Sequence, residues 1–541
     1  MKTQFLGKQL SGPFTIPSGI VTCSTSIIQR VMDTIPEVGV LTTKSIGPEP
    51  RLGYREPILA QYKPGCFVNA VGLTNPGAAR SAELLAELEV PEDRFLLISI
   101  FGGSIEEYVE VARQLAPYGD GLELNLSCPH AKGYGMAMGQ DPELVEEIVR
   151  AVKAAVDIPV IPKLTPNVPN IDEIARAAEQ GGADAICAIN TMGPERYAVF
   201  GHDVLSNGKG GMSGKEVLPT ALDCVTRIAA TVSCPIIACG GISSAQNVRE
   251  FQRAGASIIG IGSALIGMTT REMADYFQTL SADLSDATDR AESLVHYDVD
   301  MSFRPVTLRS NERVTDDVAI LTFDQEINVQ AGEFIFLWIP GLGEKPFSAL
   351  VDNPFKLVVI NLGQFTGELM QLEPGTEAYV RGPHGIPVQP QSGSRIMAVA
   401  GGTGLAAVYQ IARDFGNAEI FLGARTRNRL YFVDECQAVA RLHVATNDGS
   451  QGHHGLVTEL LETRLQEMSA EELEQLVFYN CGPEPMVHAA EAVQRKYCRP
   501  AQIYNAIDYL TKCGVGICGA CGAPDGRRLC VDGPFLRALD S

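Results

Sequence analysis

Over roughly the first 280 residues, short apolar runs rich in β-branched side chains alternate with longer stretches of helical spacing. This alternation is typical of repeated βα units. Eight such units in about 250 residues have the size and strand count of a (β/α)8 TIM barrel, so the predicted fold class is α/β. A doubly wound open sheet is the alternative, but eight parallel strands favour closure. We predict the strands at residues 16–22, 39–44, 94–101, 121–126, 159–164, 183–189, 235–239 and 257–261.

The pattern changes in the second half of the chain. Residues 281–299 are polar and acidic, and from Pro305 to about Pro390 short alternating strands and Gly/Pro turns predict a small antiparallel β-barrel. From Arg395 a strand, a glycine-rich turn and a helix begin a nucleotide-binding α/β unit, and a cysteine-rich tail starts near Tyr504. We therefore expect four domains, at residues 1–295, 300–392, 393–502 and 503–541.

Length and charge narrow the class of protein. A chain of 541 residues is too long for one hydrophobic core, and 45% apolar with 20% charged residues is ordinary for a soluble globular protein. A formal net charge of −21 without a basic stripe argues against nucleic acid or an anionic membrane surface as a partner. Residues 1–12 lack the apolar core of a signal peptide, and no run of about 20 apolar residues could cross a bilayer. We expect a soluble cytoplasmic protein.

The fourteen cysteines are unevenly placed. Ten are scattered singly, many of them inside apolar runs, as Cys187 and Cys239 are. The other four lie within the last thirty residues, which indicates a metal site in a reducing compartment rather than disulfides.

The four clustered cysteines, Cys513, Cys518, Cys521 and Cys530, follow the spacing Cys-x4-Cys-x2-Cys-x8-Cys. The x4 and x2 gaps followed by a distant fourth thiolate are the pattern of plant-type [2Fe–2S] centres. A structural zinc site is the alternative, but zinc sites more often pair two Cys-x2-Cys units. Iron–sulfur is therefore the favoured interpretation.

Polar residues gather where the predicted barrel strands end, which is the face that carries the chemistry of a TIM barrel. A polar residue at the end of one strand would say little about function, but six strands share this feature. They are Lys44 at the end of strand two, Asn125, Ser127 and Cys128 at the end of strand four, Lys163 at the end of strand five, Asn190 and Thr191 at the end of strand six, and Gly240–Gly241 and Gly262–Ser263 after strands seven and eight.

These residues fit a flavin mononucleotide across the barrel mouth. Backbone N–H groups in the two glycine turns can cradle its phosphate, since no side chain blocks close approach. Lys163 can place positive charge near the flavin ring and stabilise its reduced form. Taken singly, each glycine pair could be a plain turn and Lys163 could belong to a salt bridge.

Cys128 is the candidate general base. It follows a buried strand and precedes a loop that contains Gly133, Gly135 and Gly139. A thiol beneath such a lid can remove a proton from carbon while a flavin takes a hydride from the neighbouring carbon. A buried structural cysteine is the alternative. Asn69, Asn125, Asn190 and Thr191 add three amides and a hydroxyl, which suit a flat neutral heterocycle.

The first half of the chain resembles the catalytic subunit of NAD-linked (class 1B) dihydroorotate dehydrogenases. The motifs are Lys44-Ser45, Asn69–Leu73, Asn125–Pro129, Lys163-Leu164, Ile189–Thr191 and Gly210–Gly214, in that order. The resemblance implies FMN, with Cys128 as the active-site base. It further implies substrate binding by Lys44, Asn69, Ala70, Val71, Gly72, Leu73, Asn125, Asn190 and Thr191, and FMN binding by Ser18, Lys44, Ser45, Ser99, Asn125, Lys163, Gly214, Gly240, Gly241, Gly262 and Ser263.

One departure leaves a second substrate open. The residue after Cys128-Pro129 is usually Asn in that family and is His130 here, and residues 135–144 are similar to the pyrimidine-reducing domain of dihydropyrimidine dehydrogenase. Uracil or thymine is therefore an alternative substrate. The Asn69–Leu73 stretch resembles the dihydroorotate type, in which backbone amides can hold a carboxylate. A non-enzymatic flavin and iron–sulfur redox relay is the alternative from another class.

The second half resembles ferredoxin–NAD(P) reductase-like proteins. Three motifs occur in order in the predicted antiparallel barrel, at residues 345–348, 363–366 and 382–385. The family usually has Arg where Lys345 stands, and lysine cannot grip a phosphate with two parallel hydrogen bonds. The resemblance implies FAD binding by Lys345, Pro346, Phe347, Ser348, Gly363 and Thr366.

The nucleotide-binding unit follows. A strand at residues 395–400 leads into a glycine-rich turn whose N–H groups can face a pyrophosphate. Arg425 and Arg427 could meet a 2′-phosphate or be surface charges, which leaves NAD versus NADP open. The residues expected to bind NAD are Gly401, Gly402, Thr403, Gly404, Cys481, Gly482 and Pro483.

As a whole, this half resembles the electron-transfer subunit of class 1B dihydroorotate dehydrogenase, here fused to its catalytic partner. The resemblance implies oxidation of dihydroorotate to orotate in pyrimidine biosynthesis, with electrons passing from FMN through [2Fe–2S] and FAD to NAD. By analogy, we expect a homodimer formed through the barrels.

Overall fold

The computed structural model describes residues 2–126, 138–507 and 509–539. These residues form two compact units. The first comprises residues 1–299 and 515–528, and the second comprises residues 300–514 and 529–541. A short stretch near the end of the chain thus belongs to the first unit, although both of its flanks belong to the second. Within the described ranges, no helix has both the length and the apolar character needed to span a membrane.

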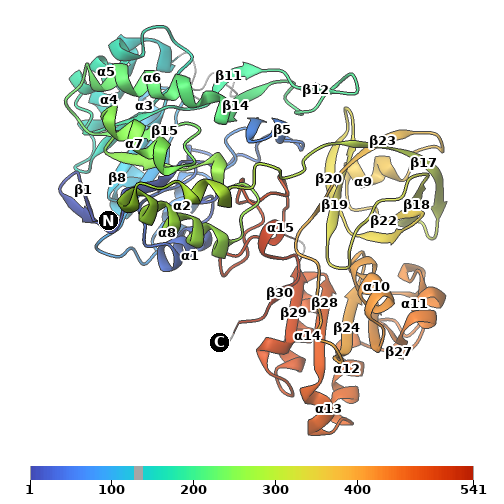
Figure 1. Cartoon of the computed structure of the whole chain (residues 1–541). Coiled ribbons are helices and arrows are strands. Elements are labelled where there is room, and N and C mark those ends of the chain that lie inside the picture. The colour runs from blue at the N-terminus through green and yellow to red at the C-terminus, as the bar shows by residue number, and fades with distance from the viewer. Residues whose placement is uncertain (1, 127–137, 508, 540–541) are drawn as a thin grey trace. The chain divides into compact units, whose positions relative to one another are not determined.

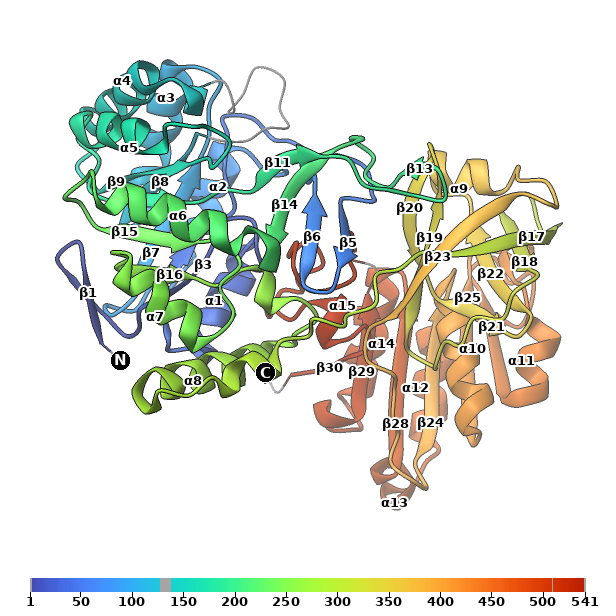
Figure 2. The same ribbon diagram turned by 45° about the horizontal axis from the view of Figure 1, so that its top comes forward.

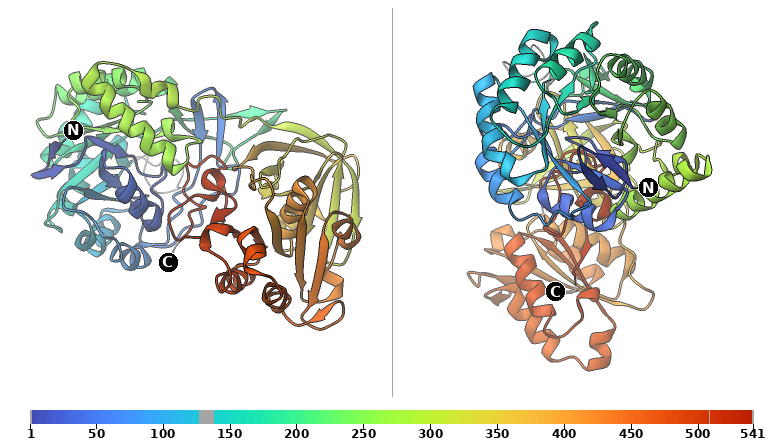
Figure 3. Two further views of the ribbon diagram at one scale, coloured as in Figure 1. Left: turned by 60° about the horizontal axis from the view of Figure 1, so that its bottom comes forward. Right: turned by 90° about the vertical axis from the view of Figure 1, so that its left-hand side faces the viewer.

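Eight parallel strands close into a barrel in the first unit, which confirms the predicted TIM-barrel architecture (Figure 1). Helices encircle the strands (Figure 3, right). The strands, in their order around the barrel, are β3 (Phe14–Ile16), β4 (Val38–Thr42), β7 (Phe95–Ile100), β8 (Gly121–Asn125), β9 (Val160–Leu164), β10 (Ile186–Ala188), β15 (Ile236–Cys239) and β16 (Ile258–Gly260). The helices are α1 (Thr25–Thr34), α2 (Ala78–Leu85), α3 (Ile105–Leu115), α4 (Pro142–Lys153), α5 (Ile171–Gln180), α6 (Leu218–Ala229), α7 (Ala245–Arg253) and α8 (Thr270–Asp286).

The first barrel strand differs from its prediction. It covers Phe14–Ile16 instead of residues 16–22. Pro17 follows directly and has no N–H to donate to a neighbouring strand, and Val21 adopts a left-handed backbone with φ of 55°. The apolar residues after Ile16 therefore belong to a loop at the barrel mouth.

The barrel interior is packed at the end where its strands begin. A hairpin of β1 (Thr3–Phe5) and β2 (Lys8–Leu10) contributes Phe5 and Leu10 to an apolar cluster with Phe95, Ile161 and Ile237. The strand residues are buried on both faces, as expected of a parallel sheet covered by helices. Apolar side chains therefore fill the end of the barrel where its strands begin.

A four-stranded sheet that the sequence did not predict adjoins the barrel mouth (Figure 2). Its order is β11-β14-β6-β5, and the pairs β14–β6 and β6–β5 are antiparallel. Asn69 faces Gly211 across the β6–β14 pair. The sheet thereby brings together two segments about 140 residues apart in the chain. Its strands are β5 (Leu59–Lys63), β6 (Cys66–Asn69), β11 (Met192–Glu195) and β14 (Gly210–Gly214), with a small hairpin of β12 (Ala198–Val199) and β13 (His202–Asp203) between the last two.

The second unit begins with a curled antiparallel sheet where an antiparallel barrel is predicted. Its ladder runs β20-β19-β23-β17-β18-β22-β21, so β20 and β21 are its two ends. Alternate residues of its strands fill an apolar core that includes Leu308, Leu321, Ile335 and Leu357. The strands are β17 (Arg304–Arg313), β18 (Val318–Phe323), β19 (Phe334–Ile339), β20 (Gly343–Phe347), β21 (Ala349–Asp352), β22 (Phe355–Ile360) and β23 (Glu377–His384), and helix α9 (Gln364–Leu369) precedes β23.

The rest of the second unit is the expected nucleotide-binding α/β sheet. Its order is β27-β26-β25-β24-β28-β29-β30, parallel except for β30, and the strand order reverses between β24 and β28. Nucleotides bind at such a switch point in open α/β sheets. The strands are β24 (Arg395–Gly401), β25 (Ala418–Ala424), β26 (Arg441–Thr446), β27 (His453–His454), β28 (Leu476–Gly482), β29 (Ile503–Ile507) and β30 (Leu536–Arg537). The helices are α10 (Gly404–Phe415), α11 (Val433–Val439), α12 (Val457–Gln466), α13 (Ala470–Glu474), α14 (Glu484–Gln494) and α15 (Leu529–Asp532).

Candidate active site

A cavity of about 220 Å³ opens at the carboxyl ends of the barrel strands. All described barrel residues predicted to bind flavin or substrate line it, except Ala70 and Ser99. A site of mixed polar and apolar character at this face is typical of TIM-barrel enzymes. The predicted residues in its wall are Ser18, Lys44, Ser45, Asn69, Val71, Gly72, Leu73, Asn125, Lys163, Asn190, Thr191, Gly214, Gly240, Gly241, Gly262 and Ser263.

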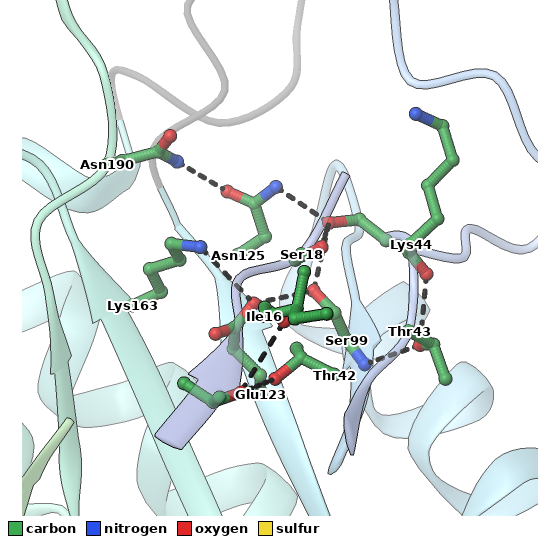
Figure 4. Close-up of polar contacts among 12 residues, drawn as sticks. Ile16, Ser18, Thr42, Thr43, Lys44, Ser99, Glu123, Asn125, Lys163 and Asn190 are labelled. Carbon is green, nitrogen blue, oxygen red and sulfur yellow. Dashed lines mark hydrogen bonds and ion pairs between the residues drawn. The ribbon is translucent and has the colours of Figure 1, made fainter. Parts of the chain in front are cut away.

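A continuous polar network links neighbouring strand ends at this cavity (Figure 4). Glu123 accepts a hydrogen bond of 2.9 Å from the Ser99 hydroxyl, which lies 2.9 Å from the hydroxyl of Ser45. Ser45 in turn lies 3.2 Å from the hydroxyl of Ser18 and accepts a hydrogen bond of 2.9 Å from Nδ2 of Asn125. Ser99 thus does not line the cavity itself, but its hydroxyl contacts Ser45, which does.

The amides of Asn125 and Asn190 are held in fixed orientations. Nδ2 of Asn190 donates to Oδ1 of Asn125 at 3.2 Å, and Oδ1 of Asn190 accepts from the backbone N–H of Thr191 at 2.9 Å. The buried hydroxyl of Tyr108 donates to the Asn125 carbonyl at 2.9 Å. The donors and acceptors that face the cavity are therefore arranged before a ligand enters.

Lys163 and Glu123 form a buried ion pair. Nζ of Lys163 lies 3.8 Å from Oε1 of Glu123, and their side chains are 6% and 2% exposed. Burial lowers the pKa of Lys163, but the negative charge of Glu123 outweighs burial, and the net pKa lies above that of an ordinary lysine. Lys163 therefore carries a positive charge into the cavity at neutral pH.

Two thiols lie beside this ion pair. Cys187 on β10 pairs with Lys163 across the ladder, and Cys239 at the end of β15 lines the cavity. The pKa of Cys187 is raised well above its usual value, first by its hydrogen bond with Cys239 and then by burial. Cys187 is thus a protonated thiol at neutral pH.

The turns after β15 and β14 require glycine. Gly240 and Gly241 have φ of 132° and 73°, and a Cβ on Gly241 would lie 2.6 Å from the carbonyl oxygen of Gly214. The turn after β16 differs, since a Cβ on Gly262 would meet only ordinary contacts at 3.7 Å. Close approach of backbone N–H groups to a phosphate is therefore built most clearly into the Gly240–Gly241 turn.

Asn69 and the turn that follows it form another part of the cavity wall. Nδ2 of Asn69 donates to the Gly211 carbonyl at 3.2 Å. Gly72 has φ of 82°, and a Cβ there would lie 2.8 Å from Tyr54. Lys44 extends away from the serine network in Figure 4 and also lines the cavity. A carboxylate entering this side would meet a lysine and exposed backbone.

Several wall residues were missed by sequence reasoning. Phe67 and Met212 come from the unpredicted sheet, and Ile517 and Cys518 come from the tail. The short apolar run before Asn69 was the available signal for β6. Nothing local in the sequence indicates that residue 517 reaches a cavity formed by the first half of the chain.

The residues predicted for FAD lie on the curled sheet and the turn before α9. Lys345, Pro346 and Phe347 belong to β20, and Ser348 follows it. The hydroxyl of Thr366 accepts hydrogen bonds from the N–H groups of Leu362 and Gly363 at 2.9 and 3.1 Å. This closes the turn in which Gly363 lies.

The residues predicted for NAD come together at the switch point of the α/β sheet. A Cβ on Gly404 would lie 2.1 Å from the carbonyl oxygen of Cys481, so the turns after β24 and β28 pack in contact. Helix α10 starts at Gly404, and its N-cap residue Thr403 makes no side-chain capping hydrogen bond. The first N–H groups of α10 therefore suit a pyrophosphate.

A family model described as "Dihydroorotate dehydrogenase" matches residues 1–282, which is more than half of the chain. The chain belongs to the dihydroorotate dehydrogenase family. Its closed barrel lies within the matched residues, as do all the residues that line the cavity except Ile517 and Cys518.

Curated members of the dihydroorotate dehydrogenase family are similar over the same half. Three are named "Dihydroorotate dehydrogenase B (NAD(+)), catalytic subunit". The protein from Pyrococcus horikoshii is 42% identical over 269 residues, or 49% of this chain and 86% of its own length. That from Thermococcus kodakarensis is 43% identical over 269 residues (48% and 84%), and that from Methanocella arvoryzae is 40% identical over 287 residues (52% and 91%). The chain is thus an oxidoreductase. About 250 further residues lie beyond this match.

The second half of this dihydroorotate dehydrogenase family member matches a model described as "Oxidoreductase NAD-binding domain" at residues 398–492. This range contains the turns after β24 and β28. A solved structure of an NADH-dependent reduced ferredoxin–NADP oxidoreductase is 27% identical and covers 43% of this chain and 87% of its own, with a TM-score of 0.39. A TM-score of 0.39 is too low to establish a shared fold.

Cys128, the predicted base, lies outside the described residues, as do His130, Gly133 and Gly135. The described chain stops at Leu126, one residue after β8 ends, and resumes at Met138. The role of Cys128 remains a prediction.

The four tail cysteines are divided between the units. Cys518 and Cys521 belong to the first unit, and Cys513 and Cys530 belong to the second. All four are buried. Among the residues that the structure describes, no group of three or more His, Cys, Asp or Glu is arranged to hold a metal ion. The donor chemistry, four thiols in a glycine-rich segment with left-handed glycines at 514, 516 and 519, fits an iron–sulfur cluster.

Proposed function

We propose that this chain oxidises dihydroorotate to orotate and passes the electrons from FMN through a [2Fe–2S] cluster and FAD to NAD. The observation that carries this proposal is the cavity at the barrel mouth, where a buried lysine, fixed amides and a glycine turn line one space. The relatives named for this activity support the barrel chemistry, and the NAD-binding match supports the choice of electron acceptor.

The substrate would bind against the polar side of the cavity. Lys44 and the backbone of the turn Asn69–Leu73 (with Ala70, Val71 and Gly72) would hold its carboxylate. Asn125, Asn190 and Thr191 would bind the edge of the pyrimidine ring, since their amides are already oriented by hydrogen bonds. A ring with alternating donors and acceptors matches this set.

Cys128 would remove the proton from the substrate carbon. It stands two residues beyond Leu126, the last described residue of the first stretch, in the chain that leaves β8. A thiol needs its pKa near the working pH to serve as a base. Bound FMN would supply the oxidising chemistry, as acceptor of the hydride that leaves the neighbouring carbon.

Lys163 and the glycine turns would hold the flavin. The turn Gly240–Gly241, with Gly262 and Ser263, would face its phosphate, and Gly214, Ser18 and Ser45 would contact it from the neighbouring loops. Lys163 would balance the negative charge that the ring gains on reduction.

The remaining half would complete the electron path. FAD would bind at Lys345–Ser348, Gly363 and Thr366, and NAD at Gly401–Gly404 and Cys481–Pro483. Cys513, Cys518, Cys521 and Cys530 would hold the cluster. Because Cys518 lines the barrel cavity, a cluster held at Cys518 would adjoin the flavin. We propose residues 1–295, 300–392, 393–502 and 503–541 as the four functional domains.

Anaerobic titration of the purified protein tests the substrate. Dihydroorotate should bleach the flavin absorbance, and dihydrouracil should leave it unchanged. Bleaching by dihydrouracil alone would assign the chain to dihydropyrimidine oxidation instead, the alternative that His130 raises. Bleaching by neither compound would overturn the proposal.

A further inference from the structure

A stretch of the tail is built into the barrel unit. Residues 515–528 belong to the first unit, whereas the segments on either side belong to the second. The N–H of Val21 donates to the Ile517 carbonyl at 2.7 Å, and the N–H of Gly267 donates to the Val515 carbonyl at 3.0 Å. These two bonds tie the tail to the loops that follow the first and last barrel strands.

A buried arginine fastens the same stretch. The side chain of Arg528 is fully buried. Its Nη1 donates to the Gly516 carbonyl at 2.7 Å, and its Nη2 donates to the Met268 carbonyl at 2.8 Å. One guanidinium thus joins the tail to the loop after β16. Hydrogen bonds from a buried charged donor are among the stronger ones in proteins.

Glycines let the stretch approach the barrel closely. A Cβ on Gly519 would lie 2.6 Å from the Val21 carbonyl oxygen, and a Cβ on Gly526 would lie 2.4 Å from that of Ser26. Both glycines have positive φ, at 63° and 78°. Side chains at these positions would push the stretch off the barrel, so the sequence is suited to this contact.

The docked stretch reaches the flavin cavity. Ile517 and Cys518 line it together with Pro17, Ile20 and Ile266, which come from the loops to which the stretch is bonded. Without residues 515–528, this wall would be open and the apolar residues beside Ile517 would face water.

We propose that Ile517 and Cys518 form the last wall of the flavin-binding site and that Arg528 is the positioning residue that holds this wall. This inference rests on the proposed function only in taking the ligand to be FMN. The wall would cover a flat, largely apolar ring, and burial of such surface slows its release into water. The barrel site is therefore completed by residues more than 200 positions away in the chain.

The test compares FMN release from full-length holoenzyme variants without substrate. Arg528→Met removes both bonds to the carbonyls, and the rate of FMN release, followed by the fluorescence of the freed flavin, should rise about tenfold. Arg528→Lys keeps the charge and should restore part of the retention. Arg527→Met is the matched control, because Arg527 pairs with Asp525 inside the same stretch, and it should release FMN at the wild-type rate.

A second variant separates the wall from folding. Ile517→Ala leaves Arg528 in place and removes one wall side chain, so it should stay folded with a lower melting temperature, release FMN faster and shift the midpoint potential of the flavin. If Arg528→Met does not fold, the results for Ile517→Ala decide whether the inference holds. Wild-type release and potential in Ile517→Ala, or wild-type release in a folded Arg528→Met protein, would overturn the inference.

These outcomes are independent of the substrate. A protein purified without any FMN would refute the proposed function and the inference together. A protein that holds FMN but fails to oxidise dihydroorotate would refute the proposed function alone. Equal FMN retention in all variants would refute only the role of residues 515–528.

Discussion

Nζ of Lys163 lies 3.8 Å from Oε1 of Glu123, and neither side chain reaches bulk water. The two residues come from the neighbouring strands β9 and β8, and their positions in the register differ by two residues. Glu123 also accepts a hydrogen bond from Ser99, so its carboxylate connects the lysine to the serine and amide network of the cavity. The charge that Lys163 presents to a ligand is therefore set in part by Glu123.

Replacement of Glu123 by Gln should raise the midpoint potential of the flavin that is bound in the barrel cavity. The substitution leaves the Lys163 charge uncompensated, which favours a reduced, negatively charged ring, and it should slow NADH formation because electrons leave the flavin less readily. A potentiometric titration of the holoenzyme measures the shift. Breaking this buried pair should also destabilise the barrel by about 3 kcal/mol.

Glu216→Gln is the control for this substitution. Glu216 pairs with Lys63 at 2.8 Å, but both side chains are largely exposed. Exposed ion pairs contribute little to stability, so the potential and the melting temperature should stay at wild-type values. An unchanged potential in Glu123→Gln would show that the pair does not act on the flavin.

Replacement of Cys128 by Ala should lower turnover of dihydroorotate about a hundredfold or more, because general-base catalysis is lost. FMN should remain bound, since no FMN contact is assigned to Cys128. Cys224→Ala, at a buried cysteine on α6, should turn over at the wild-type rate. Near-normal activity in Cys128→Ala would remove the thiol from the mechanism.

Replacement of Cys530 by Ser should abolish the iron content of the protein. Reduction of a soluble dye by dihydroorotate should continue, because the barrel site is intact, while NADH formation should cease. Cys498→Ser provides the comparison, since the Cys498 thiol donates to the Leu473 carbonyl at 3.7 Å and lies outside the four-cysteine motif. Zinc in place of iron in the wild-type protein would contradict the relay.

Replacement of Gly404 by Ala should weaken NAD binding. A Cβ would lie 2.1 Å from the Cys481 carbonyl oxygen, which forces apart the turns after β24 and β28. The KM for NAD should rise about tenfold or more, with dye reduction unchanged. Gly367→Ala within α9 meets only an ordinary contact at 3.4 Å and should behave as wild type. An unaltered KM in Gly404→Ala would place the nucleotide elsewhere.

Glu419 should make the second unit sensitive to acid. Burial raises its pKa, but hydrogen bonds from His443, Arg464 and Arg395 outweigh burial and hold the pKa well below the ordinary value. A carboxylate with a depressed pKa stabilises the fold above its unfolded pKa of about 4.5, and this contribution is lost as pH falls through the folded pKa. The melting temperature of the second unit should therefore decrease as the pH is lowered from about 5.

Glu419→Gln tests that dependence. It should lower the melting temperature at pH 7, because Arg395 and Arg464 each lose one of their carboxylate partners, and flatten the decline in acid. Glu462→Gln, which removes the partly exposed partner of Lys496, should leave the acid profile as it is. The same steep profile in Glu419→Gln would assign the acid sensitivity to other carboxylates.

Local patterns predicted most of the barrel and little of its surroundings. Buried β-branched runs are a local signal, so seven of the eight strands were predicted close to their observed positions, and Asn125 and Lys163 could be assigned to the barrel mouth from their places at strand ends. The first strand was misplaced because the apolar residues after Pro17 continue the pattern although the backbone turns. Apolar content does not report such a turn.

Long-range pairings explain what was missed. The β6 strand is four residues long and pairs with β14 far along the chain, so its own sequence carries little signal. The partnership of Glu123 with Lys163 depends on the register of two strands. The docking of Ile517 depends on Arg528 and on loops near Val21 and Gly267, which no periodicity connects.

The most direct test of the central claim is to quantify orotate and NADH together during anaerobic turnover of dihydroorotate by the full-length protein with NAD. We predict that both products form in equal amounts and that the flavin reoxidises when NAD is in excess. Orotate without NADH, or no orotate at all, would contradict it.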